Sequence, residues 1–449
     1  MTTTSRTTLF CLHGLGLNAA VFDALRHELG DEIDVVAIDL PGFGGEPAAS
    51  GTDVDDMVAL VERRIRAHGA ARWLLLGHSM GGKVATLAAA RVLDGSASVF
   101  GLAGVVLLAA SPPTPEPMDD ESRTAMLDTA AGERIDEAAA REFVDDNIGE
   151  ALPADLDALA MDAVRASDPA AWRAWLRRGS LEDRGVALEP LPYPALVVAG
   201  GADSDLGEDA QRQLVAPWFP RARVEVLEGA AHFLMLERPA ELARLIRDFA
   251  ETACSGPLAP PGVARLIASD RTSARTRSIL ARRAISDDPE YAPSALTSSQ
   301  LELLRVLAAR LVPQDGPAID VAARVDAQLA AGSGDGWRHV TLPPDIEAYR
   351  RALDGLERWR SEPPEKWDEL LDKIADGQVE VDGLEPAALT AWLEDATVDL
   401  VRQWLAHPAT MAEIGFDGFA TGGDRVRIQG FIELSAGSRE DWEPEEVAS

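Results

Sequence analysis

Short, continuously apolar runs alternate with helical patterns over residues 1–252 of this 449-residue chain. Six runs rich in Val, Leu and Ile stand out, and they are TLFCL, DVVAIDL, WLLLG, AGVVLLAA, PALVVAG and ARVEVLE. A strand that is apolar on both sides must be covered on both faces, as strands of a parallel sheet are. The alternation of such strands with helices therefore predicts an α/β fold with a doubly wound, mainly parallel sheet.

One interval, at about residues 112–190, interrupts this alternation. It opens with SPPTPEP and continues with helical patterns such as ERIDEAAAREFVDDN and DPAAWRAWLRRG, without a strand pattern. A helical insertion above the carboxyl edge of a sheet would act as a cap and would shape the substrate pocket. Trp172 and Trp175 lie in this insertion, and we expect them in its core, with a place in an apolar pocket wall as the alternative.

Residues 253–295 are rich in Pro, Gly, Ser and basic side chains, which predicts a linker. Beyond it, LTSSQLELLRVLAARLVP has leucines at helical spacing, with Thr297 or Ser298 as the N-cap. DIEAYRRALDGLERW and ALTAWLEDATVDLVRQWLAHP repeat this amphipathic pattern. The sequence therefore predicts an α/β domain at 1–252, a linker at 253–295 and a separate all-α domain at 296–449. The three predicted apolar stripes comprise Leu301, Leu304, Leu307, Leu311, Ile346, Tyr349, Leu353, Leu356, Leu389, Trp392, Leu400 and Trp404.

Charge and cysteine content limit the partners. The 75 acidic residues outnumber the 42 basic ones and give a net charge of −33, which repels nucleic acid and anionic lipid. No apolar run is long enough to cross a bilayer, and the first residues lack the pattern of a signal peptide, so we expect a cytoplasmic protein without membrane contact. Cys11 and Cys254 form neither a disulfide framework nor a metal-binding spacing, and no metal is expected.

The stretch WLLLGHSMGGKVATLAAARVL places Ser79 between a buried strand and a helix of small residues. A G-x-S-x-G sequence in this context is typical of a nucleophile elbow, a strained turn that exposes the serine hydroxyl above the sheet. Gly77 and Gly81 would allow the helix to cross close to the strand. Lys83, one turn into the helix, is expected to be a surface charge.

Elimination among the seven histidines indicates the general base that such a serine requires. Four of them lie on helices before the elbow or in the second domain, and these are His27, His68, His339 and His407. His13 belongs to the loop after the first strand, and His78 is adjacent to the serine and cannot turn back onto it. His232 remains, in LEGAAHFLMLERP, where it follows the last strand at the carboxyl edge of the sheet.

The acid that orients the histidine should follow a strand between Ser79 and His232. Asp203, in ALVVAGGADSDL, is favoured because it follows its strand by the shortest turn, and Asp205 is the alternative. Glu116 and Asp119, after the strand VVLLAAS, are less favoured.

An oxyanion hole needs two backbone N–H groups directed at the developing negative charge. One is predicted at Met80, directly after the serine at the helix N-terminus. The other is predicted at Leu15 or its neighbour, in the loop LHGLGLN, which His13 and Gly14 would shape.

The motifs LHGLG, DLPGFG, GHSMGG, GGAD and GAAHFLMLERP, in this order over about residues 7–252, resemble the α/β-hydrolase superfamily, particularly its small esterases and lactonases. The resemblance implies a Ser79–Asp203–His232 triad that transfers an acyl group from an ester or lactone to water, without a cofactor. The superfamily also contains haloperoxidase-like enzymes, dehalogenases and C–C bond hydrolases. A serine at the elbow argues against dehalogenases, which use an aspartate there.

The second half of the chain, over about residues 295–435, is similar to the small subunit (subunit 3) of gluconate 2-dehydrogenase. The similar segments are LTSSQLELLRVLAARLVPQDG and WLAHPATMAEIGFDGFATGGDRVRIQGF, although Asp424 stands where that family often has asparagine and the usual twin-arginine signal is absent. The resemblance implies docking to a flavin-dependent (GMC-type) dehydrogenase subunit. Two hypotheses follow: an ester or lactone hydrolase with a docking domain, or a non-catalytic accessory subunit of a flavin-dependent sugar dehydrogenase.

Overall fold

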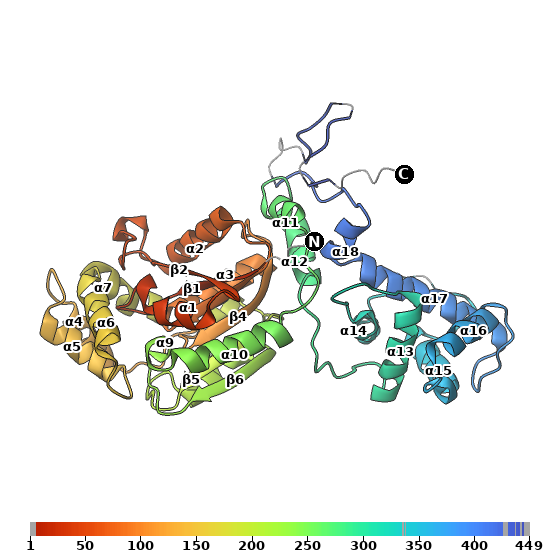
Figure 1. Ribbon diagram of the computed structural model, residues 1–449, viewed down its shortest axis with the longest axis horizontal. Coiled ribbons are helices and arrows are strands. Elements are labelled where there is room, and N and C mark those ends of the chain that lie inside the picture. Colours follow the sequence, from red (N-terminus) through yellow and green to blue (C-terminus); the bar gives the residue numbers. More distant parts are fainter. Residues whose placement is uncertain are drawn as a thin grey trace. The chain divides into compact units, whose positions relative to one another are not determined.

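The computed structural model describes residues 6–334, 336, 338–424, 430–435, 437–440 and 442–443. These residues form two compact units, whose helices and strands are shown in Figure 1. The first unit contains the described residues up to Ser286 together with those from Phe416 onward, and the second is Asp287–Gly415. Within the described ranges, no helix has both the length and the apolar character needed to cross a membrane.

A six-stranded parallel sheet forms the centre of the first unit (Figure 1). Its strands are β1 (Thr7–Leu12), β2 (Ile33–Ile38), β3 (Trp73–His78), β4 (Leu102–Leu108), β5 (Pro194–Gly200) and β6 (Arg221–Leu227). All six apolar runs form strands, and the prediction of a mainly parallel sheet is confirmed. The strand order β2-β1-β3-β4-β5-β6 reverses direction at β1 and β3, and the carboxyl ends of these two strands flank the crevice where such sheets bind ligands.

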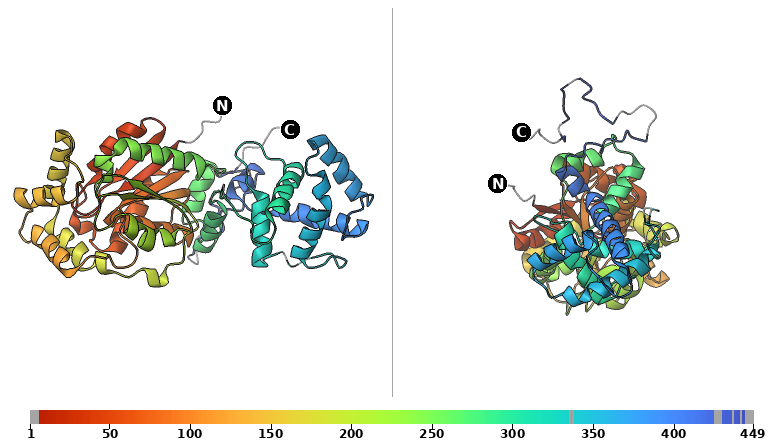
Figure 2. Two further views of the ribbon diagram at one scale, coloured as in Figure 1. Left: turned by 90° about the horizontal axis from the view of Figure 1, so that it is seen from below. Right: turned by 90° about the vertical axis from the view of Figure 1, so that its right-hand side faces the viewer.

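Helices cover both faces of this sheet (Figures 1 and 2). Right-handed crossovers place α1 (Asp23–Leu29) on one face, where it packs against α10 (Pro239–Thr252). The same rule places α2 (Val54–His68) and α3 (Met80–Leu93) together on the other face. Because both faces are covered, every residue of β3 and of β5 is buried. Two short helices, α8 (Glu208–Ala210) and α9 (Leu234–Glu237), follow β5 and β6.

The cap lies between β4 and β5, as the sequence predicts. It contains α4 (Asp120–Thr129), α5 (Glu137–Asp146), α6 (Ala154–Ala166) and α7 (Pro169–Arg177). Helix α5 packs on α6 and α4 packs on α7. Trp172 and Trp175 of α7 are both buried, and the Trp172 indole N–H donates to the carbonyl oxygen of Met126 at 2.8 Å.

The predicted linker is wrong for much of its length, because two helices occupy it: α11 (Pro261–Ala268) and α12 (Ala274–Arg283). Helix α12 packs on α3, and the buried Arg277 guanidinium donates to the carbonyl oxygens of Gly95 (2.7 Å) and Ile267 (2.9 Å). The basic composition of this segment predicts a solvated linker. Part of it, however, comes from Arg277, which is buried and donates its hydrogen bonds to backbone carbonyl oxygens.

The second unit is a bundle of helices, as predicted (Figures 1 and 2). The helices are α13 (Ser298–Leu311), α14 (Val321–Ala331), α15 (Asp345–Leu356), α16 (Pro364–Ala375), α17 (Pro386–Leu405) and α18 (Pro408–Glu413). Thr297 is the N-cap of α13, in a capping box with Gln300. Nine of the twelve predicted stripe residues are buried, and Leu311, Ile346 and Trp404 are half-buried.

The boundary predicted at residue 449 for the helical domain differs from the structure, because the described residues from Phe416 onward belong to the first unit. The Thr272 hydroxyl donates to the Phe419 carbonyl oxygen at 3.1 Å, and the Asp424 carboxylate accepts from the Ala274 N–H at 3.0 and 3.1 Å. These bonds tie the segment to α11 and α12. Residues 425–429 of the quoted glycine-rich motif and the last six residues of the predicted domain lie outside the described residues.

Candidate active site

Ser79 occupies a strained turn between β3 and α3. Its backbone angles are φ 49° and ψ −121°, in a region that residues with a side chain rarely adopt. A Cβ at Gly77 would lie 2.3 Å from the carbonyl oxygen of Gly81, and one at Gly81 would lie 2.6 Å from that of Leu12. The absence of side chains at these two positions lets α3 pass close to β1 and β3, which is the geometry of the predicted elbow.

His232 and Asp203 meet at the same edge of the sheet, after β6 and β5 respectively. His232 Nδ1 lies 2.7 Å from Asp203 Oδ2. The other carboxylate oxygen, Oδ1, accepts from the backbone N–H groups of Asp205 and Leu206, each at 2.9 Å. The carboxylate is therefore fixed on both sides, and it orients the imidazole so that Nδ1 carries the proton and Nε2 is free to accept one.

Electrostatics favour the ionised form of this pair. Burial alone would raise the pKa of Asp203, but the charge of His232 and the hydrogen bonds to the carboxylate outweigh it and lower the pKa to about 2. Burial alone would lower the pKa of His232, but the Asp203 carboxylate outweighs it and raises that pKa above its ordinary value. Asp203 is thus ionised at neutral pH and stabilises a proton on the imidazole.

A cavity of about 650 Å³ lies above this edge, and Ser79, Asp203, His232 and Leu15 all line it. The structure therefore brings together three of the predicted catalytic residues and one of the predicted oxyanion residues. Asp205 also lines the cavity, but Asp203 makes the bond to the imidazole. Helices α4 and α5 of the cap and Trp175 of α7 form the opposite wall.

The loop that contains Leu15 is held against Ser79. A Cβ at Gly14 would lie 2.9 Å from the Ser79 Cβ, so the loop passes directly beside the serine. His13, fully buried, accepts from the Leu40 N–H at Nε2 (3.0 Å) and donates from Nδ1 to the Gly14 carbonyl oxygen (2.8 Å). Burial lowers the pKa of His13 to about 4, so it is neutral and shapes the loop, as expected. In the described part of the chain, neither the Leu15 nor the Met80 N–H donates a hydrogen bond.

Lys83 is not a surface charge, and that prediction is wrong. Its side chain is fully buried, and Nζ donates to the carbonyl oxygens of Gly179 (2.9 Å) and Glu182 (3.1 Å) at the end of the cap. Burial lowers the pKa of Lys83 to about 8. Its position four residues after Ser79 places it on the helix face below the serine, and this spacing is the signal that could have identified it.

Three further residues shape the site: Glu116, which the sequence offers only as a less favoured acid, and Gln211 and Asn147, which carry no sequence signal. Glu116 lines the cavity and accepts a hydrogen bond from the Ser111 hydroxyl, and burial raises the pKa of its carboxyl group. The Gln211 amide bonds both backbone groups of Ala110, at 3.0 and 3.1 Å, and thus holds the loop after β4. The Asn147 carbonyl oxygen accepts from the His232 N–H at 3.1 Å and so joins the cap to the histidine loop. Within the described ranges, no group of three or more His, Cys, Asp or Glu side chains is arranged to hold a metal ion.

Comparisons with known proteins agree with this geometry. Residues 9–245 match the model of the alpha/beta hydrolase family. A pimeloyl-[acyl-carrier protein] methyl ester esterase from Neisseria meningitidis serogroup A is 30% identical over 261 residues, which cover 56% of this chain and 78% of that protein. A 2-succinyl-6-hydroxy-2,4-cyclohexadiene-1-carboxylate synthase from Serratia proteamaculans is 28% identical over 251 residues, or 54% of this chain and 92% of that protein. Among solved structures, a bromoperoxidase from Bacillus anthracis shares the fold, with a TM-score of 0.50 at 17% identity over 55% of this chain and 92% of that one.

Proposed function

Because the chain belongs to the alpha/beta hydrolase family, we propose that it hydrolyses a carboxylic ester or a lactone through an acyl-enzyme on Ser79. The observation that carries this proposal is the convergence of Ser79 and the His232–Asp203 pair on one cavity, with the pair joined at 2.7 Å. An imidazole that a carboxylate holds through Nδ1, and that lines the same cavity as a serine on a strained turn, is the arrangement needed to activate a hydroxyl.

In the proposed reaction, Ser79 Oγ attacks the carbonyl carbon of the ester while His232 Nε2 takes its proton. The Leu15 and Met80 N–H groups receive the negative charge that develops on the carbonyl oxygen. The C–O bond to the alcohol then breaks, and the imidazolium gives its proton to the leaving oxygen. Water, activated by the same imidazole, attacks the acyl-enzyme and releases the acid and Ser79.

A fluorophosphonate probe tests the nucleophile directly. The probe should label the wild-type protein and fail to label Ser79→Ala, while Ser111→Ala, which changes a buried serine near the same cavity, should still be labelled. Equal labelling of wild type and Ser79→Ala, or of neither, would contradict the mechanism. Methyl and aryl esters compared with aldonolactones in steady-state assays would then distinguish an esterase from a lactonase, since only a lactonase should favour the cyclic esters.

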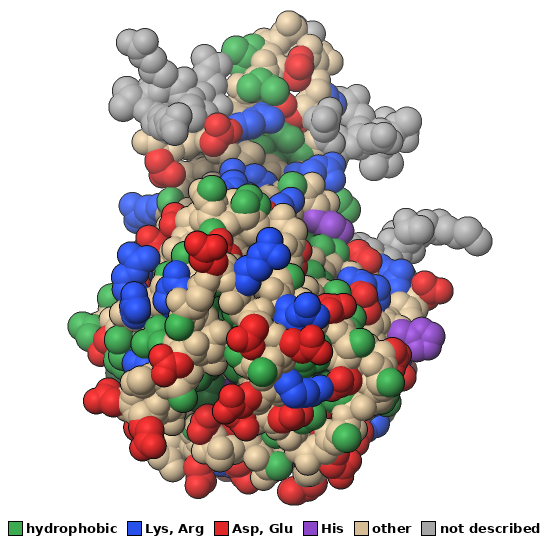
Figure 3. Space-filling view, turned by 90° about the vertical axis from the view of Figure 1, so that its left-hand side faces the viewer, with side chains coloured by type: hydrophobic (Ala, Val, Ile, Leu, Met, Phe, Trp, Pro, Cys, Tyr) green, Lys and Arg blue, Asp and Glu red, His purple; other side chains and the backbone are tan. Residues whose placement is uncertain are grey.

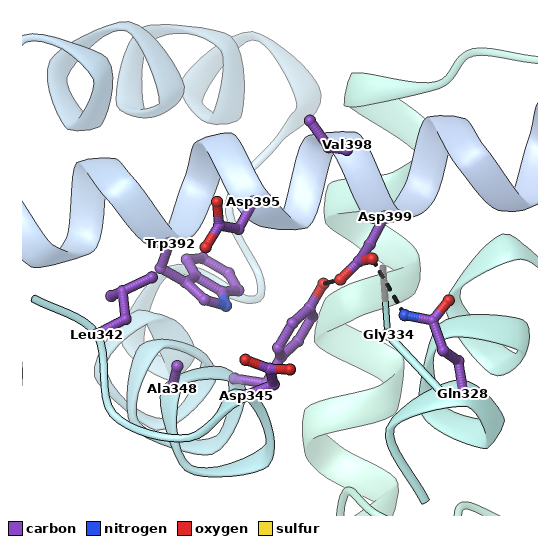
Figure 4. A pocket seen from close by; sticks show the side chains of 10 residues that line it. Gln328, Gly334, Leu342, Asp345, Ala348, Trp392, Asp395, Val398 and Asp399 are labelled. Atoms are coloured by element: carbon purple, nitrogen blue, oxygen red, sulfur yellow. Dashed lines mark hydrogen bonds between the residues drawn. The ribbon is translucent and has the colours of Figure 1, made fainter. Parts of the chain in front are cut away.

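We also propose that the second unit docks a flavin-dependent (GMC-type) dehydrogenase subunit, as its resemblance to subunit 3 of gluconate 2-dehydrogenase implies. A described cavity of this unit, between α15 and α17, measures only about 40 Å³, which is room for water but not for a sugar (Figure 4). Tyr349 donates to the Asp399 carboxylate at 2.8 Å beside it, and Gln328 does so at 3.1 Å. This cavity therefore offers no room for a sugar substrate, and the docking proposal rests on the resemblance.

Co-purification of the full chain with a flavoprotein would support docking under either hypothesis. If the chain is instead a non-catalytic accessory subunit, Ser79→Ala should leave the activity of the associated dehydrogenase intact and the isolated chain should hydrolyse no ester. Hydrolysis that depends on Ser79 would exclude this alternative.

A further inference from the structure

Apart from the imidazole of His232, the ionisable side chains that line the active-site cavity are acidic. Seven of the described residues that line it are acidic, and none is Lys or Arg. Two of the seven, Asp203 and Asp205, belong to the acid loop after β5. The other five come from the cap and the loop before it, and they are Glu116, Asp119, Asp128, Glu142 and Asp146.

Most of the carboxylates on the cap wall are not neutralised by a basic partner. Asp119 caps α4 by accepting from the Ser122 N–H at 2.7 Å, which leaves its negative charge in place. Asp128, Glu142 and Asp146 are exposed and have no cationic partner among the described residues. Figure 3 looks onto the side of the first unit that carries the cap and shows Asp and Glu side chains predominating over its lower part.

Nearby basic side chains are engaged elsewhere. Arg123 of α4 donates to the Leu176 carbonyl oxygen and the Ser180 hydroxyl, both at 2.7 Å. Arg141 of α5 pairs with Asp145 of the same helix (2.8 Å) and with Asp157 of the neighbouring helix α6 (2.7 Å). Lys83 is buried and two carbonyl oxygens hold its ammonium group, whose charge acts on the carboxyl group of Glu116. The negative charges of Asp119, Asp128, Glu142 and Asp146 are therefore available to a ligand.

A concave surface lined by charges of one sign focuses the electrostatic field and selects ligands of the opposite sign. The aromatic ring of Phe143 also lines this cavity and can contact an organic cation, whereas the Trp175 ring already has the Lys83 ammonium group 5.7 Å from its centroid. We propose that, given the ester hydrolysis inferred above, this site prefers esters that carry a positively charged substituent and discriminates against esters that carry a carboxylate.

Isosteric substrates test this inference at constant size. A trimethylammonium-terminated ester is compared with its tert-butyl isostere and with a carboxylate-terminated ester, with the charged group on the acyl side in one series and on the alcohol side in the other. We expect kcat/KM at low ionic strength to be at least tenfold higher for the cation than for the isostere in one series. One carboxylate about 8 Å from the charge contributes about fivefold at an effective dielectric constant of about 40, between that of a protein surface and that of water, and several carboxylates act together. The preference should shrink as salt is added.

A matched pair of double variants distinguishes the effect of the carboxylates that line the cavity from the effect of the overall net charge of −33. Glu142→Gln/Asp146→Asn removes two carboxylates that line the cavity and should reduce the cation preference at least threefold. Glu137→Gln/Asp162→Asn removes two exposed carboxylates of α5 and α6 that do not line it, and should leave the preference within twofold. All four positions are exposed, so both variants should fold, and circular dichroism checks this.

Equal kcat/KM for cation and isostere in both series, a preference for the carboxylate ester, or an equal effect of the two double variants would overturn the inference. In each of these cases hydrolysis still depends on Ser79, so the proposed function stands. If no ester in either series is hydrolysed in a Ser79-dependent way and the probe fails to label Ser79, the proposed function itself is wrong.

Discussion

Replacing Asp203 by Asn is the most discriminating test of the site, because it keeps the shape of the side chain and removes its charge. The wild-type carboxylate accepts from two backbone N–H groups through Oδ1 and from His232 Nδ1 through Oδ2. In the variant, the amide oxygen will stay with the two N–H groups, so the amide nitrogen must face the imidazole. Since that nitrogen is a donor, it forces His232 into the tautomer with the proton on Nε2, where the imidazole cannot accept a proton from Ser79.

The expected loss follows from this change of tautomer and from the lost stabilisation of the imidazolium. We expect kcat to fall by about 10³–10⁴-fold, as it does when the orienting carboxylate of a serine hydrolase is made neutral. The wild-type carboxylate raises the pKa of His232, and the neutral amide does not. The acid limb of the residual kcat/KM profile should therefore also move to lower pH.

The assay measures kcat and kcat/KM on a neutral aryl ester across pH, with Asp205→Asn as the matched control. Asp205 lines the same cavity but makes no bond to the imidazole, so its replacement should change kcat less than tenfold. If Asp205→Asn proves the more damaging variant, or if Asp203→Asn retains more than a tenth of the activity, the assignment of the acid is refuted.

Three further outcomes are expected. In the wild type, kcat/KM should fall on acidification with a midpoint above 6.5, because the neutral imidazole is the base and Asp203 raises the pKa of His232; a midpoint below 6.5 would contradict the ion pair. Lys83→Met leaves two buried carbonyl oxygens without their donor and should cost about 1–3 kcal/mol in denaturant unfolding, whereas an unchanged free energy of unfolding would place Lys83 on the surface after all. Arg277→Met removes four hydrogen bonds to carbonyl oxygens and should cost about 2–4 kcal/mol and lower amide-exchange protection in α12; full protection would show that the helix does not depend on the guanidinium.

The parts of the fold that the sequence predicts are those set by local pattern. A strand covered on both faces has to be apolar throughout, so the six runs are visible in the sequence without knowledge of their neighbours. Ser79, Asp203 and His232 are predictable for a related reason: each follows a strand by no more than five residues, and strand ends of a parallel sheet meet at one edge. The apolar residues of the helices in the second unit are predictable in the same way, because they recur at helical spacing along one face of each helix.

The parts that the sequence does not reveal depend on partners far along the chain. Arg277 bonds a carbonyl oxygen 182 positions away, and Asp424 accepts from an N–H 150 positions away, so neither contact leaves a periodic pattern. The segment that contains Arg277 has the basic composition of a linker, and only the distant carbonyl oxygens that accept from Arg277 show that this arginine is buried. For the same reason, the composition of the sequence does not reveal that the described residues from Phe416 onward belong to the first unit.

The cap is joined at two places, one between α5 and α6 and one after α7, to the elements that carry the candidate catalytic residues. Near α5, the Asn147 carbonyl oxygen holds the His232 loop, and the Gly149 N–H donates to the Glu237 carboxylate at 2.7 Å. After α7, Lys83 of the nucleophile helix holds the carbonyl oxygens of Gly179 and Glu182. Asp128, Glu142 and Asp146 line the cavity from α4 and α5, which precede both attachments in the sequence, and none of these three side chains takes part in either attachment. Substitution on that wall can therefore change which substrate charge is favoured without moving the serine or the histidine, which is why the double variants should separate selectivity from catalysis.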